Sequence, residues 1–187
     1  MRSVADAAPP VPINVWRITD VTQPAATSQH GRVLATQLAV LLLGVFTRPN
    51  DVVIDVAADV ALAGAASGGA RRYRPVPDPA HLPSAAGPAR LILLPWPFPS
   101  PAAPVAVLTA CRRLLTADGR VTVALTPSPA PTPYVEHTRR LLPAAQHAGL
   151  DYLQHIVVTT ATADAADAAH GQDVGLNLLV FGPRTSA

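Results

Sequence analysis

The sequence predicts a doubly wound α/β domain, in which helices cover both faces of a largely parallel sheet. Short aliphatic runs, too short for helices and apolar on both sides, alternate along the chain with helical segments of about 10–15 residues. Such runs are typical of strands that are buried on both faces of a parallel sheet. The chain has 187 residues, of which 49% are hydrophobic, and this is enough for one substantial core. We therefore expect one domain over residues 13–187 after a flexible leader of residues 1–12.

The elements follow one another as helix and strand units. Apolar positions recur at helical spacing from Val33 to Phe46, where a polar turn ends the helix. Val52–Ile54 is a β-branched run that ends at Asp55, and the alanine-rich stretch after it favours a helix. Ligands of such sheets bind beyond the carboxyl ends of the strands, which places the site near Asp55 and Pro95. In order, we expect helix 33–46, strand 52–54, helix 58–67, a weak strand 72–76, a proline-rich loop 77–88, strand 91–94, helix 105–115, a turn 116–119, strand 120–125, helix 135–148, strand 152–158 and strand 176–181.

Composition and charge exclude several classes of function. All 14 basic residues are arginine, but the formal net charge is only +2, so the chain has no polybasic arm for nucleic acid. The single cysteine, Cys111, excludes an intramolecular disulfide and a cysteine-based zinc site, and the six histidines lack the spacing of a helical metal site. The longest apolar stretch, 33–46, is too short to span a bilayer. We expect a cytoplasmic protein without a metal or a membrane association, with Cys111 buried as a small apolar residue.

Several segments of the sequence resemble one known family. Residues 46–51 (FTRPND) lead into a strand and its acid at 52–55 (VVID), residues 111–121 (CRRLLTADGRV) lead into a later strand, and residues 178–181 (LLVF) close the sheet. In this order they resemble the class I S-adenosylmethionine-dependent methyltransferases, and among these the DNA methyltransferases that modify exocyclic amino groups of adenine or cytosine. The resemblance covers about residues 14–183. It implies a Rossmann-like sheet with an antiparallel last strand and S-adenosylmethionine as the cofactor.

The cofactor loop departs from the glycine-rich pattern of that family. The resemblance places the cofactor at Asp55, Ala57 and Asp59, with Asp78 as the acid that would bind the ribose. Asp59 and Ala61 stand where the family has glycines, which let the backbone pass close to the cofactor. An acid at this approach also sets a negative charge beside the methionine carboxylate, so we expect severely weakened cofactor binding. Asp55 and Asp59 also have a plainer interpretation as acids that cap the next helix.

The catalytic loop is altered as well. The family has a polar residue, two prolines and an aromatic residue, of which the first accepts a hydrogen bond from the target amine and the last stacks on the flipped base. This chain has Leu94, Pro95, Trp96, Pro97 and Phe98 instead, and Leu94 cannot accept a hydrogen bond. Pro95, Trp96 and Phe98 are the candidate site residues of this loop. Its two aromatic side chains either stack on a base or a partner, or fill an unused pocket.

The departures from the family concentrate in the site and spare the scaffold. The first hypothesis is therefore a DNA-methyltransferase-like protein with impaired catalysis that acts as a binding or regulatory scaffold. Its partner would be another protein, a second copy of the chain or a nucleic acid. The alternative is an active S-adenosylmethionine-dependent methyltransferase, acting on DNA, RNA or a small molecule, in which another acceptor replaces Leu94. A structural subunit of a larger assembly is a third possibility.

Overall fold

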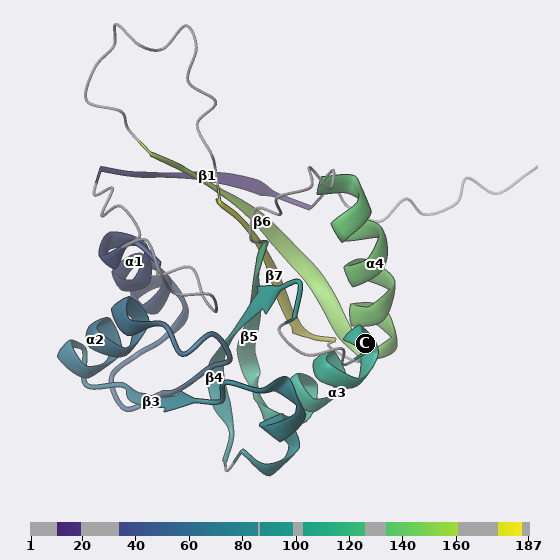
Figure 1. Ribbon diagram of the computed structural model, residues 1–187, viewed down its shortest axis with the longest axis horizontal. Coiled ribbons are helices and arrows are strands. Elements are labelled where there is room, and N and C mark those ends of the chain that lie inside the picture. Colours follow the sequence, from purple (N-terminus) through teal and green to yellow (C-terminus); the bar gives the residue numbers. More distant parts are fainter. Residues whose placement is uncertain are drawn as a thin grey trace, which may run out of the picture.

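The computed structural model describes residues 11–19, 34–85, 87–98, 103–125, 134–160 and 176–184 (Figure 1). Seven strands form one sheet in the order β1-β6-β7-β5-β4-β2-β3. The strands are β1 (Ile13–Ile18), β2 (Val52–Asp55), β3 (Arg72–Pro75), β4 (Ala89–Trp96), β5 (Leu115–Leu125), β6 (Leu150–Thr160) and β7 (Leu176–Pro183). The helices are α1 (Thr36–Phe46), α2 (Val60–Gly68), α3 (Pro104–Leu114), α4 (Tyr134–His147) and the short 3-10 helix η1 (Pro79–Ser84).

The sheet is parallel except at β7, which runs antiparallel to both of its neighbours, β5 and β6. Figure 1 shows α1 and α2 on one side of the sheet and α3 and α4 on the other. Two buried clusters correspond to these two sides: α1 and α2 pack in one, and η1, α3 and α4 pack in the other. The predicted doubly wound fold with an antiparallel last strand is therefore confirmed.

Local patterns explain why these segments form these elements. In α1 the buried side chains include Leu38 and Leu42, which lie one turn apart and form an apolar stripe against the sheet. All four residues of β2 are buried, because helices cover both faces of the strand. Cys111 of α3 is fully buried, and burial raises the pKa of its thiol to about 12. A thiol with this pKa stays protonated, so Cys111 is a packing residue.

The structure also corrects several predicted boundaries. β1 was not among the predicted strands, because Ile18 is its only buried residue and no buried aliphatic run marks it. Residues 116–119 were predicted as a turn but belong to β5, where the register with β4 shifts between Ala89 and Leu91. β4 continues through Pro95, which has no N–H to donate. Because Pro95 lies beyond the last residue of β4 that pairs with β2, the pairing with β2 loses no hydrogen bond. The expectations for residues 1–10 and for the connection 161–175 concern segments outside the described residues.

Ala70 offers a test of backbone strain in the turn between α2 and β3. Its φ is 54°, a left-handed conformation that costs a residue with a Cβ about 1 kcal/mol and that glycine adopts freely. Ala70→Gly is expected to raise the free energy of unfolding by about 0.5 kcal/mol, because the freedom of glycine in the unfolded chain offsets part of the relief. Ala63→Gly, inside α2, is the matched control and should lower it by about 1 kcal/mol. Urea unfolding measures both, and a loss of stability in both variants would contradict the strain.

Candidate functional site

The candidate site lies at the carboxyl edge of β2, β3 and β4. β2 pairs in parallel with β3 on one side and with β4 on the other, so all three strands end at the same edge. The chain passes from β2 through α2 to β3 and then crosses back to β4 on the far side of β2. Open α/β sheets bind their ligands where the strand order reverses in this way.

Asp55, the last residue of β2, is fully buried at this edge. Its Oδ1 accepts a hydrogen bond from the backbone N–H of Ala57 at 2.8 Å, and its Oδ2 accepts from the N–H of Asp59 at 2.7 Å. The Tyr73 hydroxyl donates to the same Oδ2 at 2.8 Å, because Tyr73 pairs with Val53 and therefore lies on the same face of the sheet as Asp55. Burial raises the pKa of Asp55 above its ordinary value, and the three donors oppose this.

Asp59 is the N-cap of α2 and is also buried. Its Oδ1 accepts from the N–H groups of Ala61 at 2.9 Å and Leu62 at 3.0 Å. Its Oδ2 accepts from the N–H of Leu34, which lies just before α1, so this carboxylate joins the starts of two helices. The negative charge is also favourable at the positive end of the α2 dipole.

The loop between β2 and α2 is thus a closed loop, in the sense that its own carboxylates accept hydrogen bonds from its backbone N–H groups. Residues Asp55, Ala57 and Asp59, which the resemblance placed at the cofactor, do lie together in one short turn. The two acids together accept from four N–H groups of residues 57–62, and among the described residues neither pairs with a cationic side chain. The loop therefore presents four N–H groups that already donate to side chains, and two buried carboxyl groups.

Asp78 occupies a different position from these three residues. It follows β3 and caps η1, where its Oδ1 accepts from the N–H of Ala80 at 2.9 Å. Its Oδ2 makes no hydrogen bond within the described part of the chain. The structure therefore leaves one oxygen of this carboxylate for a ribose hydroxyl, but it does not bring Asp78 into the hydrogen-bonded loop of Asp55 and Asp59.

The aromatic residues at the end of β4 pack against α4. Trp96 is only 4% exposed, and its indole N–H donates to Nδ1 of His137 at 2.9 Å. The guanidinium of Arg140 lies 5.5 Å from the centre of the indole ring, and the half-buried Phe98 meets the ring edge to face at 4.9 Å. Pro95 lies within β4 just before this group. The chain itself thus surrounds Trp96, an arrangement that matches a filled pocket more closely than a free stacking platform.

A second polar cluster lies on the same side of the sheet, and sequence reasoning did not find it. His155 Nε2 lies 2.9 Å from Oδ1 of Asn177, and this contact is a hydrogen bond in the tautomer that carries its proton on Nε2. In that tautomer Nδ1 accepts from the Tyr134 hydroxyl at 3.3 Å, and the Tyr134 and Tyr152 hydroxyls lie 3.4 Å apart. Burial raises the pKa of Tyr152, which keeps that hydroxyl protonated. Because these four residues come from α4, β6 and β7, no local sequence motif could have identified them.

Two kinds of feature are absent from the part of the chain that the structure describes. It contains no group of three or more His, Cys, Asp and Glu side chains placed to hold a metal ion. None of its helices is long and apolar enough to cross a membrane.

No protein-family model matches the sequence, and no curated protein is similar enough to count as a match. Solved structures, in contrast, share its architecture. The structure of precorrin-6y C5,15-methyltransferase from Geobacter metallireducens has a TM-score of 0.50 and 9% identity, over 84% of this chain and 93% of that one. The chain has a methyltransferase fold.

The methyltransferase fold of this chain is also similar to that of proteins with other names. Precorrin 8W decarboxylase from Methanobacterium thermoautotrophicum has a TM-score of 0.50 and 11% identity, over 81% of this chain and 91% of that one. TrmN from Thermus thermophilus has a TM-score of 0.46 and 19% identity. The match covers 80% of this chain and about half (49%) of TrmN. One of these proteins is named a decarboxylase, so the methyltransferase fold gives the frame of the site and leaves the reaction to its residues.

Proposed function

We propose that this chain is a binding or regulatory protein built on the methyltransferase fold, of the DNA amino-methyltransferase type, and that its methyl-transfer activity is impaired. The observation that carries this proposal is the closed loop between β2 and α2. There the carboxylates of Asp55 and Asp59 accept hydrogen bonds from N–H groups that a bound anion would need. The sequence resemblance to the DNA enzymes over residues 46–55 supports the origin of the scaffold.

S-adenosylmethionine is the cofactor that the fold implies, and the loop residues do not fit its anionic end. The methionine carboxylate of the cofactor needs N–H donors, but those of Ala57, Asp59, Ala61 and Leu62 already donate to side-chain carboxylates. A second anion at this place would also meet the charges of Asp55 and Asp59, which no cation of the described chain offsets. Binding would require the loop to open and to leave buried groups unpaired, which costs about 1–3 kcal/mol for each group.

Calorimetric titration with S-adenosylmethionine and S-adenosylhomocysteine tests this proposal. We expect no saturable heat at millimolar concentrations of either molecule, in a sample whose cooperative thermal unfolding shows that it is folded. Binding in the micromolar range would overturn the proposal, because the closed loop would then be able to open at little cost.

One observation favours the alternative, an active methyltransferase with another proton acceptor in place of Leu94. In the tautomer that donates from Nε2 to the Asn177 amide oxygen, Nδ1 of His155 is the acceptor of the Tyr134 hydroxyl, and a histidine held in this way can serve as a general base. If the titration shows tight binding, transfer of a labelled methyl group to DNA, RNA or small molecules becomes the next measurement. Loss of transfer in His155→Gln, with unchanged cofactor affinity, would then support this role.

The partner of the proposed scaffold is a protein, a second copy of the chain or a nucleic acid. The mass in solution, measured by light scattering, decides whether the chain associates with itself. A mobility-shift assay with single-stranded and double-stranded DNA decides whether it binds nucleic acid. If neither shows association, another protein is the remaining partner class.

A further inference from the structure

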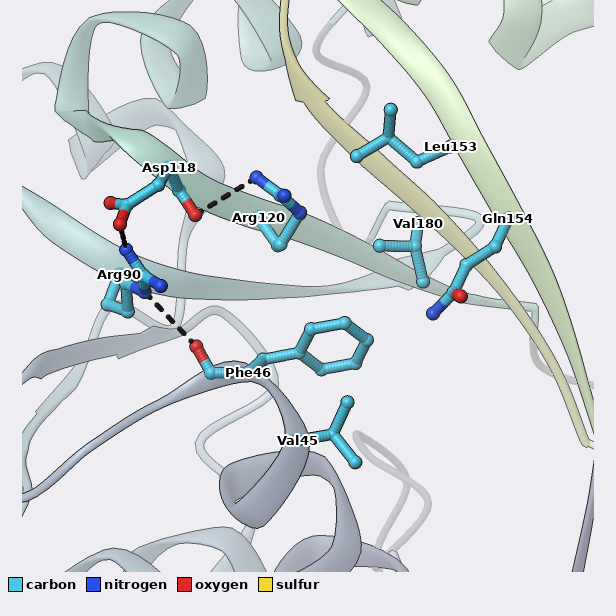
Figure 2. Close-up of a pocket in the computed structure, with 8 residues that line it drawn as sticks. All are labelled: Val45, Phe46, Arg90, Asp118, Arg120, Leu153, Gln154 and Val180. Atoms are coloured by element: carbon cyan, nitrogen blue, oxygen red, sulfur yellow. Dashed lines mark hydrogen bonds and ion pairs between the residues drawn. The ribbon is translucent and has the colours of Figure 1, made fainter.

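A pocket of about 320 Å³ lies away from the candidate site, at the amino ends of the parallel strands. Arg90 stands at the start of β4, whereas Trp96 ends the same strand at the carboxyl edge. Figure 2 shows the two guanidinium groups of Arg90 and Arg120 on one side of the pocket, with Val180 and Gln154 on the other side and Phe46 below. The volume is within the range of small-molecule sites.

Arg120 is held in place before any ligand arrives. Its Nη1 donates to the backbone carbonyl oxygens of Asp118 at 2.9 Å and Gly119 at 2.8 Å. The side chain lies across Gly182 of β7, where a Cβ would stand 3.2 Å from the same Nη1. Its Nε and Nη2 make no hydrogen bond to any described residue, so these donors are fixed in position and free.

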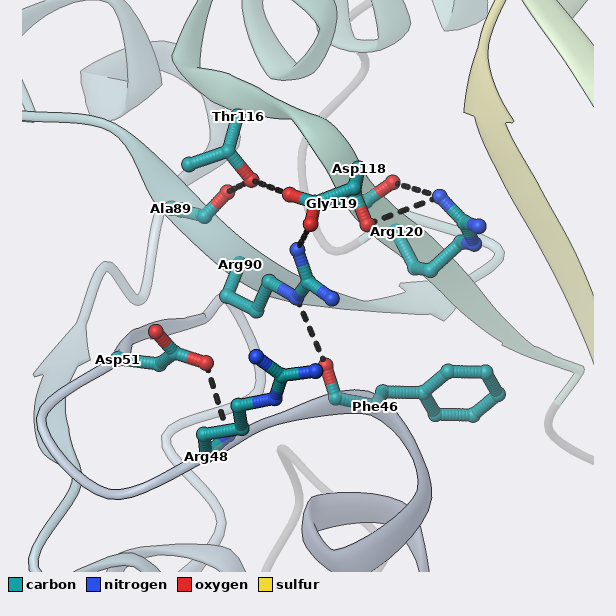
Figure 3. A network of polar contacts seen from close by, with 9 residues as sticks. All are labelled: Phe46, Arg48, Asp51, Ala89, Arg90, Thr116, Asp118, Gly119 and Arg120. Atoms are coloured by element: carbon teal, nitrogen blue, oxygen red, sulfur yellow. Dashed lines mark hydrogen bonds and ion pairs between the residues drawn. The ribbon is translucent and has the colours of Figure 1, made fainter.

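The charges around the pocket do not balance. Arg90 forms an ion pair with Asp118, and its Nε donates to the Phe46 carbonyl oxygen at 3.4 Å (Figure 3). Asp118 also accepts from the Thr116 hydroxyl at 3.1 Å, so its carboxylate is shared between two donors. Two guanidinium groups thus face one carboxylate. Burial, and after it the like charge of Arg90, lower the pKa of Arg120, and an anion between the two groups would relieve this repulsion.

The other half of the pocket is apolar, except for one amide. Val45, Phe46, Leu153 and Val180 line it. Gln154 accepts a hydrogen bond from Asn14 through its Oε1 at 3.0 Å, which leaves its amide N–H groups as further donors. The pocket therefore combines free donors and one excess positive charge with an apolar wall, and its free polar groups are chiefly donors.

We propose that this pocket binds a small organic anion, a carboxylate or phosphate monoester with an apolar body. The head group lies between Arg90 and Arg120, where guanidinium groups bind two oxygens at once. The apolar body packs against Phe46 and Val180. This proposal does not depend on the one made for the carboxyl edge, because the two sites share no residue.

Phenyl phosphate, benzoate and inorganic phosphate are the probes that test the proposal, in titrations of the isotope-labelled protein followed by NMR. We expect saturable shifts at the amides of Arg120, Gln154 and Val180, and tighter binding of phenyl phosphate than of inorganic phosphate. Arg120→Gln should lower the affinity for phenyl phosphate at least tenfold. Arg139→Gln, at an exposed arginine of α4, should leave the affinity unchanged.

Four outcomes would overturn the proposal. The first is the absence of saturable shifts in the unmodified protein, a result that does not depend on the folding of any variant. The second is shifts that appear equally at other arginines, and the third is inorganic phosphate that binds as tightly as phenyl phosphate. The fourth is an Arg120→Lys variant that keeps full affinity, because this variant keeps the charge and loses the forked donor group. Binding of S-adenosylhomocysteine bears on the carboxyl edge only, so the two proposals fail separately.

Discussion

Asp59→Ala is expected to lower the free energy of unfolding by about 3 kcal/mol. An ordinary N-cap contributes about 0.5–2 kcal/mol, and Asp59 supplies this through its bonds to the N–H groups of Ala61 and Leu62. Its second oxygen also accepts from the buried N–H of Leu34, and leaving such a donor unpaired costs about 1–3 kcal/mol. The effect should exceed that of a simple cap because the carboxylate joins the start of α1 to the loop after β2.

Asp78→Ala is the matched control for this prediction. Asp78 is also an N-cap, but it accepts one hydrogen bond, from Ala80, at a less buried helix start. We expect this variant to lose about 1 kcal/mol or less. Urea unfolding of both variants and the native protein gives the two differences. Equal losses would mean that the bond to Leu34 contributes nothing, and that the loop is closed by an ordinary helix cap.

The sequence predicted the strands of the sheet except β1, which lies at one edge. Val52–Ile54 and Leu91–Leu94 could be recognised because helices cover both of their faces, and full burial leaves an uninterrupted aliphatic run. β1 has one buried residue, and its place beside β6 depends on contacts with residues 155–160, which lie far along the chain. The antiparallel last strand followed from the resemblance to a family and not from periodicity. β1 lacks the buried aliphatic run on which such predictions rest, whereas β3, at the other edge, was predicted at 72–76 and is found at Arg72–Pro75.

The candidate site shows the same limit at the level of side chains. The resemblance located Asp55 and Asp59 at the loop after β2, but it could not say that both carboxylates turn inward to the backbone. The hydrogen bond from the Tyr73 hydroxyl to Asp55 depends on the pairing of Tyr73 with Val53, which no spacing in the sequence reveals. The cluster around His155 combines three distant elements. Sequence reasoning therefore found which acids are present, and the structure was needed to show what they bind.

Asp55→Asn is expected to change the dependence of stability on pH. Burial raises the pKa of Asp55 above 3.8, so the folded protein binds this proton more tightly than the unfolded chain does. This contribution to stability is complete below the ordinary pKa and is lost as the pH rises through the pKa of the folded state. Asparagine is neutral throughout, but it turns an amide toward the N–H of Asp59, which costs about 1–3 kcal/mol. The advantage of the native protein should therefore be largest near about pH 3 and shrink toward neutral pH, by about 1.4 kcal/mol for each unit of pKa elevation.

Urea unfolding of both proteins from about pH 3 to about pH 7 measures this trend, and titration of the Asp55 carboxyl carbon by NMR gives its pKa directly. Tyr73→Phe is the companion variant: it removes one of the three donors, so it should raise the pKa of Asp55 further and steepen the decline. An advantage of the native protein that grows with pH would show that the donors outweigh burial. Asp55 would then be an ionised cap whose charge the loop already stabilises. Both Asp55 and Asp59 would in that case repel a cofactor carboxylate, whereas a raised pKa of Asp55 leaves this repulsion mainly to Asp59 near the pH at which Asp55 is protonated.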